Sequence, residues 1–184
     1  MGISATSKDS WLEAGYELFA LEGPAALQVE PQARKLGRSK SSFYHHFGDM
    51  GVFQQAMLER HLSQARLLAR RESQCANLDP ELIQVLLEFR TDLLFSRQLR
   101  FHNAEPSYAR CLQEASAAIG PEFWALWARE MDLANRPDVS RALYDRLQDT
   151  FFLQLSPQNL TEEALRQFFQ QVRQLVHSLK TTPV

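Results

Sequence analysis

Residues 37–47 read GRSKSSFYHHF, and the interpretation of the rest of the chain starts from this stretch. A glycine turn is followed by a run that is basic and polar on one side and aromatic on the other. Read as a helix, the run places Phe43 and Phe47 on one face, because four residues make about one helical turn. Ser39 is a good N-cap for such a helix. The pattern therefore predicts a short helix with an aromatic inner face and a hydrogen-bonding outer face.

The outer face of this helix carries side chains of the kind that bind base edges and phosphates in DNA. Residues 34–46 contain four lysines and arginines and no acid. A solvated helix start without a special function is the alternative interpretation, since serine and lysine are common at such positions. The DNA-binding interpretation predicts contacts from Gln28, Arg38, Ser39, Lys40, Ser41, Ser42, Tyr44, His45 and His46.

The composition is that of an ordinary globular protein. The formal net charge of −2 argues against binding polyanions over the whole surface, but allows one local basic face. No apolar run is long enough to span a bilayer and no secretory signal is visible, so we expect a cytoplasmic protein without a membrane partner. Cys75 and Cys111 lack metal-ligand spacing and are expected to be reduced thiols.

Apolar residues recur at spacings of three and four, and no segment alternates cleanly, so the chain is predicted to be all-α. We expect Gly120-Pro121 to separate two helices and residues 97–103 to form a connector or a turn of helix. A short helix at residues 29–36, a break at Gly37 and a third helix from Ser39 predict helix-turn-helix geometry. The predicted helices span residues 7–21, 29–36, 39–46, 49–73, 80–96, 107–118, 121–131, 139–155 and 161–179.

Residues 8–53 resemble the DNA-binding domain of TetR-type transcriptional regulators. The resemblance implies a TetR-like fold with a helix-turn-helix domain at residues 1–50 and a helical effector-binding and dimerisation domain at residues 51–184. It further implies a ligand-responsive repressor that binds a palindromic operator in double-stranded DNA as a homodimer. The resemblance rests on Ala14-x-x-x-Leu18-Phe19-x-x-x-Gly23, Val29-x-x-x-Ala33-x-x-x-Gly37 and the run from Ser39 to Phe47.

Four positions depart from the family's usual pattern. Threonine is usual at Gln28, isoleucine at Gln32 and valine at Arg38, and a lysine is usual at the start of the fourth helix, where this chain has Met50. An outward-pointing Arg38 would add a phosphate contact, whereas Met50 cannot make one. Gln28, Gln32 and Met50 support an alternative function, a dimeric interaction protein that keeps the TetR fold but has weak or lost operator binding.

Two further sites are expected in the body. A group of aromatic residues is a candidate pocket for a small apolar or aromatic effector, with plain core packing as the alternative: Phe89, Phe95, Phe101, Tyr108, Trp124 and Trp127. The last two helices carry more large apolar residues than packing on one neighbour needs. The resemblance implies that these helices pair with their copies in a second subunit, through Leu143, Leu147, Phe151, Leu165, Phe168, Phe169, Val172 and Val176.

No residue pattern indicates catalysis. The sequence contains no phosphate-binding loop, nucleophile elbow or metalloprotease motif. His102 and Glu105 lie three residues apart and could in principle hold a metal, but a polar pair at a helix junction is the simpler interpretation. We therefore expect a DNA-binding regulator that is not an enzyme and that has no cofactor and no metal site.

Overall fold

Three helices and one short turn form an N-terminal head in the computed structural model, which describes residues 7–181. They are α1 (Ser7–Glu22), η1 (Pro24–Ala26), α2 (Val29–Leu36) and α3 (Lys40–Phe47). Gly37 ends α2 in the left-handed region with φ of 62°, a conformation that side chains other than glycine rarely adopt. Ser39 caps α3 by accepting a hydrogen bond from the backbone N–H of Ser42 at 3.2 Å. The predicted helix-turn-helix geometry is confirmed.

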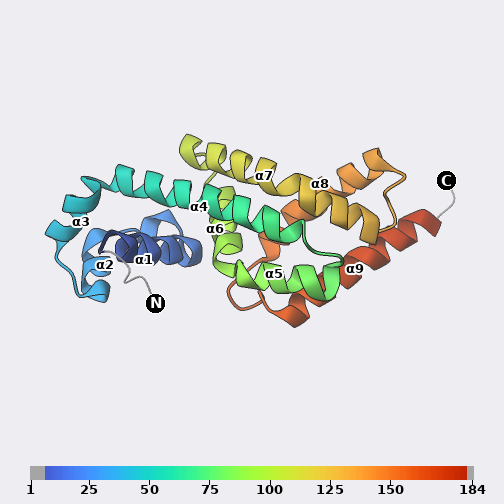
Figure 1. The fold of residues 1–184 in the computed structure, drawn as a ribbon, viewed down its shortest axis with the longest axis horizontal. Helices are drawn as coiled ribbons and strands as arrows, with labels where there is room; N and C mark the ends of the chain where they lie inside the picture. Colours follow the sequence, from blue (N-terminus) through green and yellow to red (C-terminus); the bar gives the residue numbers. More distant parts are fainter. Residues whose placement is uncertain (1–6, 182–184) are drawn as a thin grey trace.

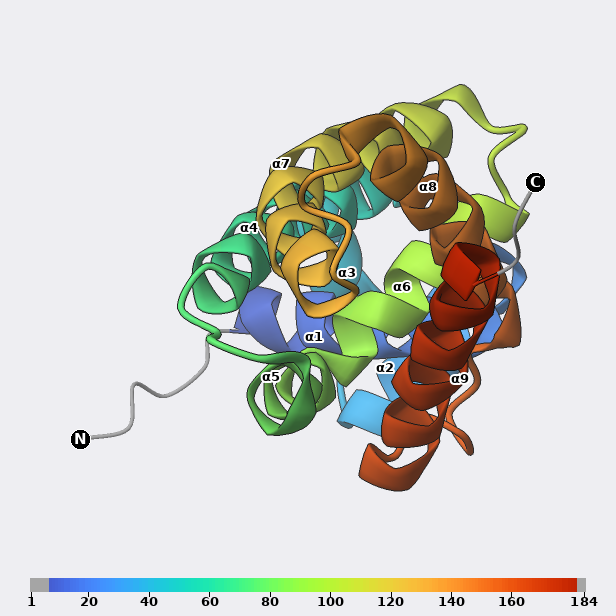
Figure 2. The same ribbon diagram turned by 90° about the vertical axis from the view of Figure 1, so that its right-hand side faces the viewer.

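The long helix α4 (Met50–Glu72) leads from the head into the body of an elongated molecule (Figure 1). Asp49 caps it by accepting a hydrogen bond from the backbone N–H of Val52 at 2.9 Å. Seen along the long axis, α6 lies near the centre of the body, with the other body helices around it (Figure 2). The body elements after α4 are η2 (Leu78–Leu82), α5 (Ile83–Glu88), α6 (Arg90–Phe101), α7 (Pro106–Glu130), α8 (Pro137–Gln154) and α9 (Glu162–Thr181). No strand occurs in residues 7–181, so the all-α prediction is confirmed.

The prediction of a single helix at residues 80–96 was wrong. The helical geometry is interrupted at Phe89, with φ of −97° and ψ of 24°, and residues 97–101 belong to α6. The interruption lets α5 pack against α9 while α6 packs against α1. This segment is apolar on most sides. Because the chain changes direction at Phe89, its first half is packed on α9 and its second half on α1. Asn77 caps η2, the element before α5, by accepting a hydrogen bond at Oδ1 from the backbone N–H of Glu81 at 3.1 Å.

The break predicted at Gly120-Pro121 was also wrong, because α7 continues through both residues. Pro121 has no N–H to donate to the preceding turn, which weakens the helix locally. Side chains on both sides of the pair are nevertheless buried, with Ala115 before it and Trp127 after it. Packing of one long helix along α4 therefore outweighs the local preference of the two residues.

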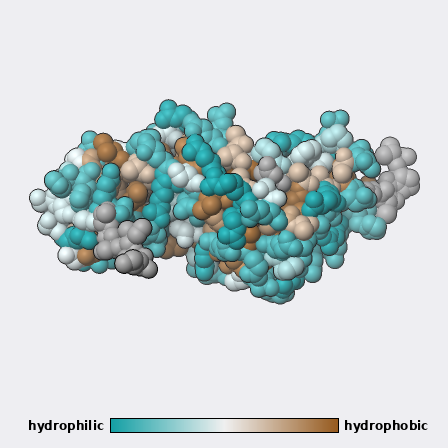
Figure 3. Space-filling model, viewed as in Figure 1, coloured by the Kyte–Doolittle hydropathy of each residue, from teal (hydrophilic) through white to brown (hydrophobic). Residues whose placement is uncertain are grey.

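One apolar core connects the head with the body. In the head, the Trp11 and Phe43 rings meet edge to face with centroids 5.3 Å apart, and Phe43 also contacts Phe53 of α4. A Cβ added at Gly15 would come within 2.2 Å of the Phe53 ring, so glycine is needed where α1 meets α4. The face seen in Figure 3 shows hydrophobic residues only as small patches among hydrophilic ones. None of the helices within residues 7–181 is long and apolar enough to cross a membrane.

Candidate nucleic-acid interface and interior cavity

Helix α3 presents polar side chains outward from the head. Phe43 and Phe47 are buried, whereas Tyr44 is 53% exposed. The division into an aromatic inner face and a polar outer face is therefore confirmed. Of the nine residues predicted to contact DNA, Ser42 and His46 are half-buried, and the exposed ones are Gln28, Arg38, Ser39, Lys40, Ser41, Tyr44 and His45.

Two of these nine residues bind to α1. The Ser42 hydroxyl accepts a hydrogen bond from the Trp11 indole N–H at 3.5 Å and lies 3.4 Å from the Ser7 hydroxyl. Arg38 donates from Nη1 to the Ser7 hydroxyl at 2.8 Å and stays exposed, as an outward-pointing side chain should. These bonds hold the start of α3 against the start of α1, so the outer face of α3 has a fixed orientation in the head.

Lys40 forms an ion pair on the outer face. Its Nζ lies 2.9 Å from Oε2 of Glu30, and both side chains are exposed. The hydrogen bond and the charge of Lys40 lower the pKa of Glu30, with a smaller contribution from Arg34. Exposed ion pairs are weak and are screened by salt. Lys40 can therefore exchange Glu30 for a DNA phosphate, but Glu30 also places a negative charge beside the proposed interface.

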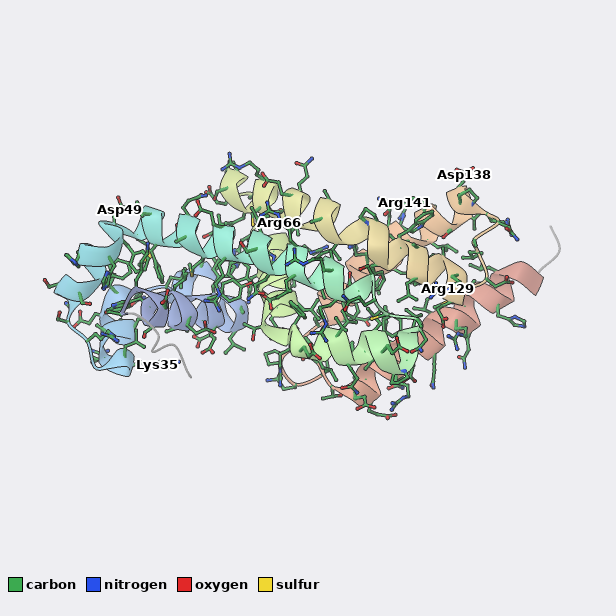
Figure 4. All side chains as sticks on the ribbon, viewed as in Figure 1. Lys35, Asp49, Arg66, Arg129, Asp138 and Arg141 are labelled. Atoms are coloured by element: carbon green, nitrogen blue, oxygen red, sulfur yellow. The ribbon has the colours of Figure 1, made fainter. Side chains whose placement is uncertain are left out.

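The departures at Gln28, Gln32 and Met50 have different structural consequences. Gln28 stands at the N-cap of α2 but makes no side-chain cap bond. Gln32 is 2% exposed, and neither polar atom of its amide has a hydrogen-bond partner. Met50 is half-buried and opens α4 without a charge. In Figure 4, Lys35 and Asp49 lie at the same end of the molecule, so this end carries charges of both signs.

The body contains a cavity of about 70 Å³ among α4, α6, α7, α8 and α9, with Leu86 of α5 also in its wall. Most of its wall is apolar or aromatic, including Leu68, Phe123, Trp127 and Phe169. Such a wall with a few polar groups is typical of small-molecule sites. The polar and charged residues of the wall are His61, Glu72, Asp92, Ser96, Arg100, Ser116, Tyr144 and Gln148.

Only Trp127 of the six predicted pocket residues lines this cavity. Phe95 instead stacks on Tyr16 and lies close to Phe19, with ring centroids 4.3 Å apart in both pairs. These contacts hold α6 on α1, so the core-packing alternative describes Phe95. The other four lie outside the cavity wall: Phe89 and Tyr108 are buried in the core, Trp124 is partly buried, and Phe101 is 48% exposed.

The residues predicted for the dimer interface are largely used inside the chain. Five of them, Leu147, Phe151, Phe168, Phe169 and Val172, line the cavity. Leu165 and Val176 are buried, and Leu143 is partly buried. The strongly exposed apolar side chains of the last two helices are different ones, namely Val139, Leu153, Leu175 and Leu179.

A chain of hydrogen bonds connects the cavity wall with the head. The Tyr16 hydroxyl of α1 donates to Oδ1 of Asp92 at 2.6 Å. Its oxygen can then accept from Nδ1–H of His61, which lies 2.8 Å away. With the proton on Nδ1, Nε2 accepts from the Ser96 hydroxyl at 3.1 Å. We call these four residues the junction network. Three of them, His61, Asp92 and Ser96, line the cavity.

Burial determines the charge states in this region. Burial, reinforced by the nearby charge of Arg100, lowers the pKa of His61 to about 3, so its imidazole is neutral at pH 7. Burial raises the pKa of Asp92, while the hydrogen bond from Tyr16 and the charge of Arg60 act in the opposite direction. Burial lowers the pKa of Arg100 to about 10, which leaves it a cation at neutral pH.

Sequence reasoning missed the junction network because its hydrogen-bonded members are up to 76 residues apart along the chain and none carries a motif. It also missed Arg100, which was placed in an expected connector. Within residues 7–181, no group of three or more potential ligands is positioned to hold a metal. His102 and Glu105 therefore belong to no such group.

The helix-turn-helix region matches a known protein family. Residues 12–54 match the model of the bacterial regulatory proteins of the tetR family. A proposed TetR-family transcriptional regulator from Mesorhizobium loti MAFF303099 has a similar structure, with a TM-score of 0.54 and 14% sequence identity, covering 94% of this chain and 95% of that one. A second, from a Rhodococcus species, has a TM-score of 0.51 and 21% identity, covering 92% of this chain and 97% of that one. A comparison with curated proteins gave no match.

Proposed function

Because the chain has the fold of TetR-family regulators and carries their helix-turn-helix, we propose that it is a ligand-responsive repressor that binds a palindromic operator as a homodimer. In this proposal residues 1–50 bind DNA and residues 51–184 bind an effector and form the dimer. The outward face of α3 is the observation that carries the proposal. Its exposed hydrogen-bonding side chains stand on a helix whose orientation is fixed by Phe43, Phe47 and Ser42.

DNA recognition divides between two kinds of contact. Ser41, Tyr44 and His45 project from α3 and would reach base edges in the major groove, which accommodates a helix. Arg38, in the turn before α3, and Lys40, at the start of α3, would bind backbone phosphates and fix the position of the head. Base contacts provide the sequence preference, and phosphate contacts provide most of the affinity and its salt dependence.

The junction network supports a response to a ligand. Its bonds run from Ser96 in the cavity wall through His61 to Tyr16 of α1, the helix that also contacts α3. A ligand that displaces Ser96 or His61 has to shift a hydrogen bond held by the head. Effector binding and DNA binding would thereby be coupled through one set of side chains, and by linkage each would change the affinity for the other by the same factor.

A dimer follows from the form of a palindromic site. One head reads one half-site, and a two-fold axis places the second head on the other half-site. In the body, Leu153, Leu175 and Leu179 are exposed apolar residues of α8 and α9. We assign the subunit interface to these exposed positions, with the previously predicted interface residues packed behind them.

The alternative, a dimeric interaction protein with weak or lost operator binding, also has support. Gln32 buries an amide without a hydrogen-bond partner inside the head. Glu30 places an acid next to the proposed DNA-binding side chains. Both features would reduce the stability or the DNA affinity of the head.

The two functions are separated by measuring DNA binding directly. Fluorescence anisotropy would be recorded with DNA flanking the protein's own gene and with fragments that the purified protein selects from its source genome. For a repressor we expect tight binding that weakens in Lys40→Ala, with a salt slope shallower by about one. Glu30→Gln should tighten binding, because it releases Lys40 and removes a negative charge. A folded wild type that selects no fragment above background would favour the interaction protein.

A further inference from the structure

Arg100 is a cation in the cavity wall, and it forms no ion pair with the side chains that the structure describes. Its guanidinium carbon lies 3.7 Å from the centroid of the Phe152 ring, and Nη1 donates to the backbone oxygen of Ser96 at 3.4 Å. Asp149 acts on Arg100 only from a greater distance. A guanidinium has five N–H donors, and among the described residues only the Ser96 backbone oxygen accepts a hydrogen bond from it.

An unpaired charge in a partly apolar site is unfavourable unless a counter-ion accompanies it. Arginine also has the planar, two-pronged geometry that matches a carboxylate. The rest of the cavity wall is dominated by rings and aliphatic side chains, which favour an apolar ligand body. The two features together indicate a molecule with one anionic end and one apolar end.

The cavity wall also contains two acids, Asp92 and Glu72, and neither forms an ion pair with Arg100 among the described contacts. Asp92 is already engaged by the Tyr16 hydroxyl and by the charge of Arg60. Glu72 lies eleven residues beyond His61 on α4, which is roughly 16 Å along the helix. Since the charge of Arg100 acts on His61, the cation belongs to the end of the cavity nearer the head. The charges of Glu72 and Arg100 both act on Tyr144, and the anion is expected on the Arg100 side of the cavity.

We propose that the effector is a small carboxylic acid anion with an apolar or aromatic body. Its carboxylate binds Arg100, and its body packs against Phe123, Trp127 and Phe169. This inference rests on the proposed function, because it names the effector of the ligand-responsive repressor. The cavity of about 70 Å³ favours a small ligand body. The proposal adds an anionic end to the small apolar or aromatic effector expected from the sequence.

The proposal explains how binding reaches the head. Arg100 is hydrogen-bonded to the backbone oxygen of Ser96, so a carboxylate on Arg100 lies close to the Ser96 hydroxyl. It then competes with Nε2 of His61 for the proton of that hydroxyl. Loss of this bond frees His61 to move relative to Tyr16, and the junction network transmits the change to α1.

The test measures ligand binding by the full chain without DNA. Isothermal titration calorimetry would compare benzoate and hexanoate with the neutral benzamide and hexanamide and with the cation benzylamine. We expect the two carboxylates to bind at least roughly tenfold more tightly than the amides, as a charge-assisted hydrogen bond provides. Arg100→Met should abolish this preference, and Arg100→Lys should retain part of it.

Arg97 provides a matched control. It lies one turn earlier on α6, and its guanidinium also stacks on a ring, at 4.5 Å from the centroid of Phe101, but it does not line the cavity. Arg97→Met should therefore bind the carboxylates as the wild type does. If Arg100→Met does not fold, two measurements still test the ligand class. They are the affinities of Arg100→Lys and the comparison of acids with amides in the wild type.

Three results would overturn the ligand class: equal affinity for acid and amide, carboxylate binding that survives in folded Arg100→Met, or binding of none of the probes. Anisotropy with operator DNA, run in parallel, separates this inference from the proposed function. A chain that binds operator without preferring carboxylates contradicts only the ligand class. A chain that binds carboxylates but no DNA contradicts the repressor function.

Discussion

The Tyr16 hydroxyl lies 2.6 Å from Oδ1 of Asp92 and thereby joins the first helix of the head to α6 of the body. The Tyr16 ring also stacks on Phe95 of the same helix, with centroids 4.3 Å apart and planes 12° from parallel. Head and body are thus connected by packed side chains as well as by the continuous helix α4. A movement of α6 caused at the cavity therefore acts directly on α1.

Tyr16→Phe should weaken the coupling between effector and DNA. The variant keeps the ring but leaves the Asp92 carboxyl and the Nδ1–H of His61 without their partner. We expect a loss of about 1–3 kcal/mol in the free energy of unfolding, typical of a buried group left unpaired. Urea denaturation measures this loss, and anisotropy with and without effector measures the coupling.

Tyr108→Phe is the control for that experiment, since Tyr108 also packs on α1, with its ring 5.5 Å from that of Phe19, but lies outside the junction network. Its effector response should equal that of the wild type. If Tyr16→Phe releases DNA at the same effector concentration as the wild type, the network does not carry the signal.

Acid should destabilise the protein through His61. The pKa of His61 is about 3 in the folded chain and near 6.5 when unfolded, so the unfolded chain takes up the proton first. The contribution of His61 is complete above pH 6.5 and is lost as the pH falls from 6.5 towards 3, with a slope approaching about 1.4 kcal/mol per pH unit. Asp92 has a raised pKa and acts in the opposite direction, because the folded state binds its proton more tightly.

Urea unfolding of the wild type and His61→Gln between pH 7 and pH 4 would isolate this contribution, because the carboxylates titrate in both proteins. The wild type should lose stability more steeply than the variant over this range. Parallel pH profiles for the two proteins would mean that His61 is not buried as a neutral side chain.

Gln32→Met should stabilise the head. The glutamine buries an amide that has no hydrogen-bond partner, and methionine has a similar length without a polar amide. Removing such a group should raise the free energy of unfolding by about 1–3 kcal/mol. Gln28→Met, at an exposed position, should change it by less than about 0.5 kcal/mol. Thermal denaturation followed by circular dichroism compares the two, and a lower melting temperature for Gln32→Met would show that the amide is satisfied in solution.

The head could be predicted from the sequence because its signals are local. Gly37, the Ser39 cap and the spacing of Phe43 and Phe47 lie within eleven residues and all indicate the same geometry. In the body the local signals conflict with packing. Gly120-Pro121 indicates a break, but burial on both sides keeps α7 continuous.

The interior cavity could not be predicted, because only the fold brings its wall together from the six helices α4 to α9. Trp127 was identified by its size, but Arg100 and Ser96 have no sequence pattern that distinguishes them from surface residues. The same limitation affects α9, where periodicity showed that the helix has too many apolar residues for one stripe. Periodicity alone could not show which of them face the chain's own interior.

This last distinction changes how a dimer should be tested. Phe169 and Val172 line the cavity and are 6% and 4% exposed, so a charge at either position should unfold the body rather than separate two subunits. Leu175 and Leu179 lie on the same helix but are 45% and 56% exposed.

Leu175→Glu and Leu179→Glu should therefore leave the fold intact and disrupt the subunit interface, because burying an unpaired carboxylate between two subunits is unfavourable. Sedimentation velocity at micromolar concentration should give twice the 21.2 kDa chain mass for the wild type and the single-chain mass for these variants. Gln174→Glu adds the same charge at a neighbouring exposed residue without removing apolar surface, and it should remain dimeric. A wild type that sediments at 21.2 kDa would reject the dimer and the expectation of a palindromic operator. Dimeric Leu175→Glu and Leu179→Glu variants would instead place the interface on other helices, since this part of α9 could then not lie between the subunits.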